Sequence, residues 1–335
     1  MNTNNPHIFQ DLIQILADGH AHTTQDLAKK TGLAPTDISA AFTRLTQQYS
    51  LTVRHTASGY CLQHPLNLLE KDRILATIPA TQRDRINTCT LLPYTDSTNR
   101  QARQHPPPPD RAAVWLTEYQ TAGRGRRGRR WIGSFARQLL LSVAYTYKLT
   151  LHQISGLSIA TGAVLADSLT RQGATGLSLK WPNDLHWHGQ KVAGILLEAQ
   201  SNTATETCVV LGIGINVYTD TAQQNQTDQP STSLEALGIT PDRNQLAGEL
   251  IRALLNLCTT YPDSGLAPYL DTWQRYDPWR GREVIFSGPQ NTLQGRYIGL
   301  DDAGHLLLDQ NGTQHICHTG TLRLLQHSNQ ETTLP

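Results

Sequence analysis

Apolar side chains recur at helical spacing in three short segments near the start of the chain. The first covers 9–19 and ends at a glycine, the second follows a pair of threonines that can cap it, and the third follows the glycine-containing turn 31–36. Two strand-like runs, 51–54 and 59–62, come next. Helix, tight turn, helix and a two-stranded wing are typical of a winged helix-turn-helix, so we predict such a domain over residues 1–66.

A middle region, residues 67–277, mixes strand-like runs with longer amphipathic segments. Strands are predicted at 113–119, 138–147, 177–180, 191–198 and 208–217, and helices at 68–78, 154–171 and 243–260. The pattern then changes to short strands separated by turns. These strands are predicted at 283–286, 293–300, 305–309 and 313–318. We therefore expect an α+β multidomain protein, with a mixed central sheet and a small β barrel over residues 278–327.

Length, charge and cysteine content narrow the class of protein. A chain of 335 residues can form two or three domains. Its formal net charge of +1 leaves no general excess of positive charge with which to bind polyanions. Its five cysteines are scattered and form no Cys-x-x-Cys pair, which favours reduced thiols and a cytoplasmic location. The longest apolar helical stretch, 154–169, is interrupted by polar residues, and we expect neither a signal peptide nor a membrane partner.

One segment concentrates the positive charge of the chain. Residues 123–131, which we call the Gly-Arg loop, read Gly-Arg-Gly-Arg-Arg-Gly-Arg-Arg-Trp. Glycine lets backbone N–H groups approach a ligand, and arginine offers a planar fork of donors that matches carboxylate or phosphate. The indole of Trp131 adds a flat aromatic face. The loop therefore predicts a site for a nucleotide or a nucleotide-like intermediate.

A solvated, disordered basic segment of the kind that binds RNA is the alternative for the Gly-Arg loop. The loop lies between two predicted strands, well inside the chain, which favours an ordered anion-binding loop. It is not a Walker A loop, because the Gly-Lys-Ser/Thr ending is absent, and its glycine spacing does not fit the dinucleotide-binding fingerprint.

Five further segments carry polar or small residues where a ligand could bind. In chain order they are Asp96-Ser97-Thr98-Asn99, Glu118-Tyr119-Gln120-Thr121-Ala122, Lys180-Trp181-Pro182-Asn183-Asp184, Lys191-Val192-Ala193-Gly194-Ile195-Leu196 and Gly212-Ile213-Gly214-Ile215-Asn216. Together with the Gly-Arg loop, and in this order, they resemble the family of the bifunctional biotin–protein ligase and biotin operon repressor. The resemblance extends over essentially the full length of the chain.

The resemblance implies an enzyme, a biotin–[acetyl-CoA-carboxylase] ligase. Such an enzyme condenses biotin with ATP to biotinyl-5′-AMP, releases pyrophosphate, and passes the biotinyl group to one lysine of the biotin carboxyl carrier protein of acetyl-CoA carboxylase. Mg²⁺ as a cofactor, a class II synthetase-like fold for the central domain and an SH3-like C-terminal barrel are also implied. A lipoate–protein ligase shares the fold and is an alternative, although the winged domain, the Gly-Arg loop and the barrel point away from it.

The chemistry of this reaction explains why cations are needed. The biotin carboxylate must attack the α-phosphorus of ATP, so two anions that repel each other have to be held within bonding distance. Cationic side chains and Mg²⁺ would neutralise this repulsion, and no protein nucleophile is required. By resemblance, the catalytic residues are Arg124, Arg126 and Lys191.

The resemblance also implies ligand contacts for individual residues. Those expected to contact biotin are Ser97, Thr98, Asn99, Gln120, Arg124, Gly125, Arg126 and Lys191. Those expected to contact the nucleotide are Trp131, Asn183 and Asn216, and Asp184 is expected to bind Mg²⁺. Taken singly, some have simpler interpretations: Ser97 as a helix cap, Trp131 as a packing anchor, Asn216 as a turn residue and Lys191 as an exposed hairpin lysine.

A second role is implied for the N-terminal domain, that of a biotin-responsive repressor. It would bind operator DNA as a homodimer when the adenylate is bound. The residues expected to face DNA are Thr36, Asp37, Ser39, Ala40, Thr43 and Arg44. Residues 1–64 hold four Lys or Arg against four Asp, whereas strong DNA binders usually present a basic face. A small dimerisation or regulatory module without DNA binding is therefore the alternative.

Overall fold

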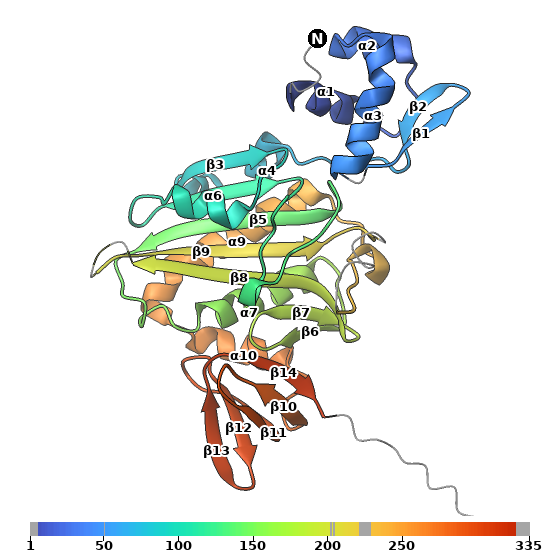
Figure 1. Cartoon of the computed structure of the whole chain (residues 1–335). Coiled ribbons are helices and arrows are strands. Elements are labelled where there is room, and N and C mark those ends of the chain that lie inside the picture. Colours follow the sequence, from blue (N-terminus) through green and yellow to red (C-terminus); the bar gives the residue numbers. More distant parts are fainter. Residues whose placement is uncertain (1–5, 50, 202, 204, 221–228, 326–335) are drawn as a thin grey trace, which may run out of the picture.

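A computed structural model describes residues 6–49, 51–201, 203, 205–220 and 229–325 of the chain. An N-terminal helical unit, a central sheet backed by helices and a C-terminal group of strands follow one another from one end of the molecule to the other (Figure 1). None of the helices described combines the length and the apolar character that a membrane crossing needs.

The N-terminal unit contains three helices and a hairpin, in the predicted order. Its elements are α1 (Pro6–Leu16), α2 (Thr24–Thr31), α3 (Pro35–Tyr49), β1 (Val53–Thr56) and β2 (Gly59–Leu62). The side chain of Thr23 caps α2 by accepting a hydrogen bond from the backbone N–H of Asp26, and Gly32 ends this helix in the left-handed conformation. Buried leucines of all three helices share one core.

The central region is built on a seven-stranded sheet. Its strands are β3 (Ile86–Leu92), β4 (Ala112–Thr117), β5 (Gln138–Tyr147), β6 (Leu177–Lys180), β7 (Asp184–Trp187), β8 (Gln190–Ser201) and β9 (Thr207–Asn216). Their order across the sheet is β3-β4-β5-β9-β8-β7-β6. The β3–β4 pair is parallel and the other pairs are antiparallel, so the predicted mixed sheet is confirmed.

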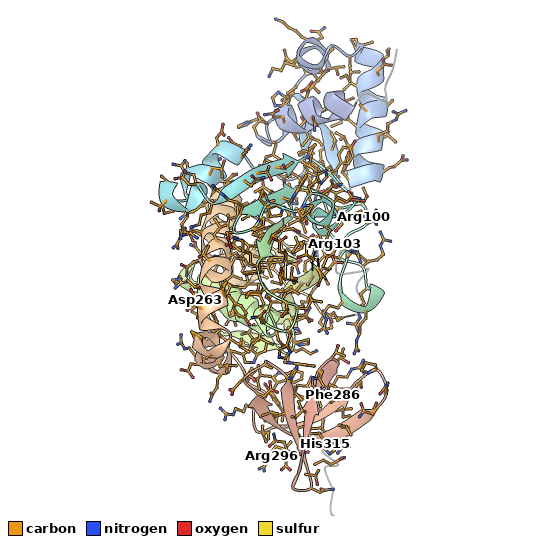
Figure 2. All side chains as sticks on the ribbon, turned by 90° about the vertical axis from the view of Figure 1, so that its left-hand side faces the viewer. Arg100, Arg103, Asp263, Phe286, Arg296 and His315 are labelled. Carbon is orange, nitrogen blue, oxygen red and sulfur yellow. The ribbon has the colours of Figure 1, made fainter. Side chains whose placement is uncertain are left out.

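Helices cover the two faces of this sheet unequally. They are α4 (Lys71–Ala76), α5 (Ala80–Arg83), α6 (Thr98–Gln104), α7 (Leu157–Arg171), α9 (Arg243–Ser264) and α10 (Ala267–Arg275), with short 3₁₀ turns η1 (Arg126–Gly128) and η2 (Glu235–Leu237). The long helices α7 and α9 bury the larger core on one face, and α6 packs on the other. Figure 2 shows both sides, with Asp263 of α9 on one and Arg100 and Arg103 of α6 on the other.

Strand β9 shows how the two faces differ. Leu211, Ile213 and Ile215 belong to the main core that α7 and α9 complete. The residues between them point to the α6 face, because side chains alternate along a strand, and here they are Gly212 and Gly214. The missing side chains leave room on this face close to the sheet backbone.

The end of α3 packs on the central region. The ring of Tyr49 lies 5.9, 5.7 and 5.5 Å from the rings of Tyr94, Tyr119 and Phe135, respectively. This aromatic group joins the N-terminal core to the loops that precede α6 and follow β4.

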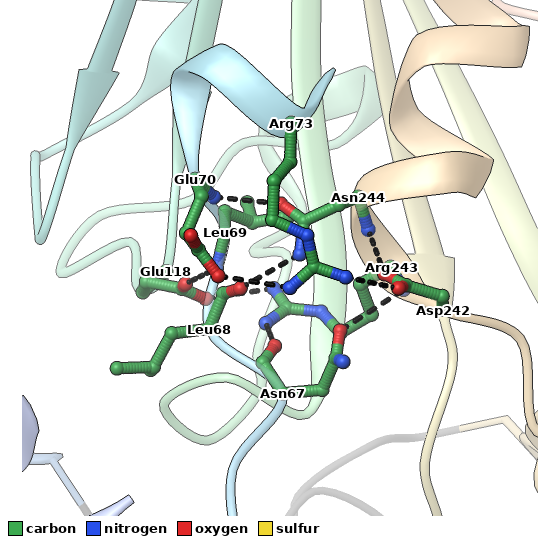
Figure 3. A network of polar contacts seen from close by, with 9 residues as sticks. All are labelled: Asn67, Leu68, Leu69, Glu70, Arg73, Glu118, Asp242, Arg243 and Asn244. Carbon is green, nitrogen blue, oxygen red and sulfur yellow. Dashed lines mark hydrogen bonds and ion pairs between the residues drawn. The ribbon is translucent and has the colours of Figure 1, made fainter. Parts of the chain in front are cut away.

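The segment that enters the central region is held by a buried polar network (Figure 3). The backbone N–H of Leu69 donates to Glu118 Oε1 at 2.5 Å, and that of Glu70 donates to Asn244 Oδ1 at 2.6 Å. Glu70 has extended backbone angles (φ −131°, ψ 116°) and is the N-cap residue, so the helix begins only at Lys71. The helix predicted at 68–78 is therefore wrong in its bounds and is shortened to α4.

Arg243 lies at the centre of this network. Its guanidinium is fully buried and lies 2.7 Å from Glu118 Oε2. It also donates to the carbonyl oxygens of Asn67 at 2.7 Å and Gln138 at 2.5 Å. One side chain thus ties the entering segment, the end of β4 and the start of β5 together.

The C-terminal strands form a five-stranded antiparallel sheet. They are β10 (Glu283–Ser287), β11 (Thr292–Leu300), β12 (Leu306–Gln310), β13 (Thr313–Cys317) and β14 (Thr321–Leu324), in the order β13-β12-β11-β10-β14. The four predicted strands are present, and β14 was not predicted. The indole N–H of Trp181 donates to Gly304 O at 3.1 Å, so these strands contact the central region.

Candidate active site

A pocket opens on the α6 face of the sheet, between β5, β8, β9 and the Gly-Arg loop. Its lining includes Ser97, Thr98, Asn99, Gln120, Arg124, Gly125, Arg126, Trp131, Asn183, Lys191, Gly194, Gly212 and Gly214. Every residue predicted to contact biotin is in this set. Of the residues predicted for the nucleotide and the metal, Asn216 and Asp184 lie outside it. Segments far apart in the sequence therefore meet at one place.

The polar end of the pocket lies at the start of α6. Ser97 is the N-cap residue, but its hydroxyl makes no capping hydrogen bond, so the helix-cap interpretation does not account for it. The backbone N–H and the hydroxyl of Thr98 donate to Gln120 Oε1 at 2.8 and 3.2 Å. Hydroxyl and amide groups are thus held in fixed positions at this end, as a polar ligand requires.

A chain of hydrogen bonds runs behind these groups. The hydroxyl of Ser142 lies 2.7 Å from both Thr98 Oγ1 and Asn99 Oδ1. The amide nitrogen of Asn99 donates to Glu198 Oε2 at 2.9 Å and to Leu196 O at 3.1 Å. Both functional groups of Asn99 are therefore engaged within the protein, and this residue positions its neighbours.

The opposite end of the pocket gathers positive charge. Lys191 Nζ lies 2.6 Å from Asp184 Oδ1, and the two side chains are only 18% and 17% exposed. The interpretation of Lys191 as an exposed hairpin lysine is therefore wrong. Arg126 donates to Asn183 Oδ1 at 3.2 Å and to Thr319 Oγ1 at 3.3 Å, so the Gly-Arg loop reaches the C-terminal strands.

The cations at this end are poorly solvated. Burial, followed by the charge of Arg127, lowers the pKa of Arg126. Lys180 does not line the pocket, but burial lowers its pKa as well, and Lys191 adds to this effect although Asp184 opposes it. Positive groups that are crowded and partly removed from water favour an anion between them, because the anion restores the lost stabilisation of their charged forms.

Trp131 forms an aromatic wall of the pocket. A Cβ added to Gly214 would come within 2.5 Å of its indole, and one added to Gly194 within 2.9 Å. The indole N–H donates to Gln138 Oε1 at 3.1 Å, and Lys191 Nζ lies 5.5 Å from the ring centroid. The indole is thus held by a hydrogen bond and fills the space that two glycines leave, and Trp131 also belongs to the pocket lining.

The Gly-Arg loop is folded, and the interpretation as a disordered basic segment is wrong. The backbone N–H of Gly125 donates to Arg129 O at 2.8 Å, and that of Trp131 donates to Gly123 O at 2.9 Å. A Cβ at Gly123 would meet Trp131 O at 2.4 Å, so glycine is needed where the two ends of the loop meet.

Asn216 lies behind the pocket rather than in it. The side chain is 2% exposed, and its amide nitrogen donates to Thr232 O at 2.9 Å and to Lys191 O at 3.3 Å. Its Oδ1 accepts a hydrogen bond from Gln138 at 2.9 Å. Asn216 therefore holds the backbone of the strand that carries Lys191.

Three residues of the site were not predicted: Gln138, Ser142 and Glu198. The strand register pairs Ser142 with Gly212 and Gln138 with Asn216, so both point to the α6 face beside predicted site residues. Glu198 lies on the same face of β8, two positions after Leu196 of the pocket lining. Polar side chains at alternate positions of otherwise apolar strands were the signal that could have identified them.

The residues predicted to face DNA lie on α3. Thr36, Ser39, Ala40, Thr43 and Arg44 are exposed, and Asp37 is partly buried. The opposite side of the helix, with Ile38, Phe42 and Leu45, is buried in the N-terminal core. α3 thus presents a polar outer face with no excess of positive charge.

Known proteins are similar to this chain in sequence. Residues 91–216 match the model of the biotin/lipoate A/B protein ligase family. The bifunctional ligase/repressor BirA of Salmonella typhimurium is 34% identical over 301 residues, which cover 90% of this chain and 92% of that protein. A biotin–[acetyl-CoA-carboxylase] ligase of Mycobacterium tuberculosis is 35% identical over 213 residues, which cover 62% of this chain and 77% of that protein.

The fold is also similar to that of a solved structure, the biotin protein ligase from Aquifex aeolicus in complex with biotin and ATP. The TM-score is 0.59 at 23% identity, and the match covers 72% of this chain and 100% of the other. The two proteins therefore share a fold. Because the similarity to the Salmonella protein extends over nearly the whole of both chains, the protein belongs to the biotin/lipoate A/B protein ligase family, in the group of the bifunctional ligase/repressor BirA.

Proposed function

We propose that the protein activates biotin with ATP to biotinyl-5′-AMP and transfers the biotinyl group to a lysine of the biotin carboxyl carrier protein of acetyl-CoA carboxylase. The observation that carries this proposal is the pocket, which joins fixed hydroxyl and amide groups to a cluster of cations beside an aromatic wall. A ureido ring needs the hydroxyl and amide groups, and a carboxylate next to a triphosphate needs the cations. The names of the similar proteins support the same reaction.

In the first step, Ser97, Thr98 and Gln120 hold the ureido ring, where each buried polar group left unmatched would cost about 1–3 kcal/mol. A carboxylate oxygen of biotin attacks the α-phosphorus of ATP. The bond from that phosphorus to the bridging oxygen breaks, and pyrophosphate leaves with the electron pair. Lys191 and Arg126 reduce the repulsion between the two anions and stabilise the charge that develops on the α-phosphate.

In the second step, the amine of the carrier lysine attacks the carbonyl carbon of the mixed anhydride. An amide bond forms, AMP leaves and the amine loses a proton. Lys191 stays close to the phosphate oxygens and favours AMP as the leaving group. Catalysis is therefore chiefly positioning and electrostatics.

Asp184 is the residue that would hold Mg²⁺. Mg²⁺ is commonly bound through one or two carboxylates together with substrate phosphates and water. Asp184 offers such a carboxylate beside Lys191. When bound, the ion would add positive charge at the phosphates.

Trp131 is proposed to stack on the adenine, and Gly214 leaves the space for its ring. Gly214→Ala should push the indole aside and weaken ATP binding about tenfold, since stacking of a base on an aromatic ring is worth about 1–3 kcal/mol. Isothermal titration calorimetry with ATP and with biotin would measure this.

Gly212→Ala is the matched control on the same strand. Its Cβ would meet Asn99 at 2.0 Å, so it should weaken biotin binding more than ATP binding. If Gly214→Ala binds ATP as tightly as the parent, Trp131 is not the adenine wall.

For the domains, we propose a winged helix-turn-helix over residues 1–66, a class II synthetase-like catalytic domain over 67–277 and an SH3-like barrel over 278–327. The three helices with their hairpin support the first, and the mixed sheet supports the second. The antiparallel order of β10 to β14 supports the third.

A second function is proposed for the N-terminal unit, repression of transcription in response to biotin. It is supported by the name of the similar Salmonella protein and by the exposed polar face of α3. A gel-shift titration against a palindromic promoter fragment, with and without biotinyl-5′-AMP, tests it. A shift that needs the adenylate is expected, and its absence would favour a ligase with an N-terminal module that does not bind DNA.

Homodimerisation is proposed through the edge of the central sheet. β7 pairs with β8 only as far as Gly194, so in the described part of the chain the outer edge of β8 beyond this residue has no partner strand. An exposed edge is a template for pairing with another chain. Sedimentation with and without the adenylate would show whether a dimer forms.

Lipoate ligation is the alternative from the same family. Transfer of labelled biotin or labelled lipoate to apo carrier protein separates the two. We expect transfer of biotin, and transfer of lipoate alone would overturn the substrate assignment.

A further inference from the structure

Glu198 is the carboxylate at which two arginines meet. Its Oε1 lies 3.1 Å from a guanidinium nitrogen of Arg124 in the Gly-Arg loop, and 3.1 Å from one of Arg103 on α6. The Glu198 side chain is 16% exposed, whereas those of Arg124 and Arg103 are 41% and 43% exposed. The loop is therefore tied to the sheet through a charge that is largely removed from water.

The other oxygen of Glu198 faces the polar end of the pocket. It accepts the hydrogen bond from Asn99, and Asn99 accepts one from Ser142, which also contacts Thr98. Thr98 donates to Gln120. A continuous series of polar contacts thus leads from the groups proposed to hold the ureido ring to the Gly-Arg loop.

The two arginines proposed as catalytic differ in their surroundings. The charge of Arg124 is matched by Glu198 inside the protein. Arg126 contacts only neutral side-chain groups, Asn183 and Thr319, and no described carboxylate lies within ion-pair distance of it. Arg126 is therefore suited to meet an anionic ligand, and Arg124 is suited to anchor the loop.

We propose that Glu198 is a positioning residue, which holds the Gly-Arg loop over the pocket through Arg124 and so retains the acyl adenylate. The inference rests on the proposed function and assigns Arg124 an anchoring role within it. A charge-assisted contact of this kind is stronger than a neutral one, so its loss should be visible in loop opening and in the escape of the adenylate.

Glu198→Gln is the test variant, because it keeps the shape and an oxygen acceptor for Asn99 while removing the charge. Loop opening can be followed without any ligand by trypsin cleavage after Arg126, Arg127 and Arg129, sites that all variants keep, read by mass spectrometry. We expect cleavage about tenfold faster than in the parent, and an adenylate that dissociates or hydrolyses about tenfold faster, while its formation changes less.

Arg103→Gln is the matched control, since it removes the other arginine at Glu198 and leaves the loop contact in place. This variant should be cleaved by trypsin at the same rate as the parent. Arg124→Gln removes the same contact from the loop side without touching the sheet. It should raise the cleavage rate and the loss of the adenylate as much as Glu198→Gln does. The variant that carries both changes should show no larger effect than either single variant.

Two results would overturn the inference. One is a Glu198→Gln variant that is cleaved and releases the adenylate as slowly as Arg103→Gln. The other is a double variant whose effect is the product of the two single effects. A parent that makes no adenylate would instead refute the proposed function, and the cleavage rates would still test the anchor. If Glu198→Gln does not fold, as judged by circular dichroism, Arg124→Gln alone decides between the outcomes.

Discussion

Lys191→Ala should slow adenylate formation by about two to three orders of magnitude, the effect of removing one charge-stabilising donor from an active site. Lys191 Nζ lies at the cationic end of the pocket, close to Trp131 and Asp184. Without Lys191, less of the negative charge on the biotin carboxylate and the α-phosphate is neutralised as they approach each other. The Asp184 carboxylate then adds to their repulsion. Single-turnover measurement at saturating biotin and ATP isolates this step.

Lys148→Ala is the control for Lys191→Ala. Lys148 also pairs with an aspartate, Asp110, but both side chains are more than half exposed. We expect the rate of the parent from this variant and unchanged thermal unfolding from both. Lys191→Ala that keeps at least half of the parental rate, or that fails to fold, would show that Lys191 is a structural residue.

Arg243→Ala should cause the largest loss of stability, about 3–5 kcal/mol in the free energy of unfolding. The substitution leaves the Glu118 carboxylate, 6% exposed, without its partner and removes donors from Asn67 O and Gln138 O. Because Gln138 holds Trp131 and Asn216, the pocket should loosen as well. Urea unfolding followed by circular dichroism measures the effect.

Arg73→Ala is the control, since Arg73 lies in the same network (Figure 3) but is 49% exposed. It should move the unfolding midpoint little. Glu118→Gln combined with Arg243→Ala should cost less than the sum of the two single changes, because neither charge is then left alone. Equal midpoints for Arg243→Ala and Arg73→Ala would mean that the buried pair does not hold the entering segment.

Contiguous motifs made most of the site predictable. Ser97, Gln120, Arg126 and Lys191 stand in short segments whose residue types suit polar and anionic ligands, and the structure gathers them in one pocket. The strands and long helices of the central region were also close to their predicted bounds, since their apolar periodicity is strong.

Contacts between distant residues could not be predicted in this way. The anchor at Glu198 joins two residues far apart in the sequence, and the pair of Glu118 and Arg243 depends on how β4 and α9 pack. The start of α4 also depends on distant residues, because Asn244 holds its extended N-cap residue Glu70 and Glu118 holds the neighbouring Leu69. The sequence alone likewise does not show that the Asn216 side chain is hydrogen-bonded inside the protein, because its partners are set by the tertiary structure.

Pyrophosphate release by the purified chain tests the central claim most directly. The cations and the polar groups of one pocket are proposed to bring the biotin carboxylate onto ATP. Release should therefore require biotin and ATP together and should be about two to three orders of magnitude slower in Lys191→Ala. Release of pyrophosphate that does not depend on biotin, or no release with both substrates present, would contradict the account.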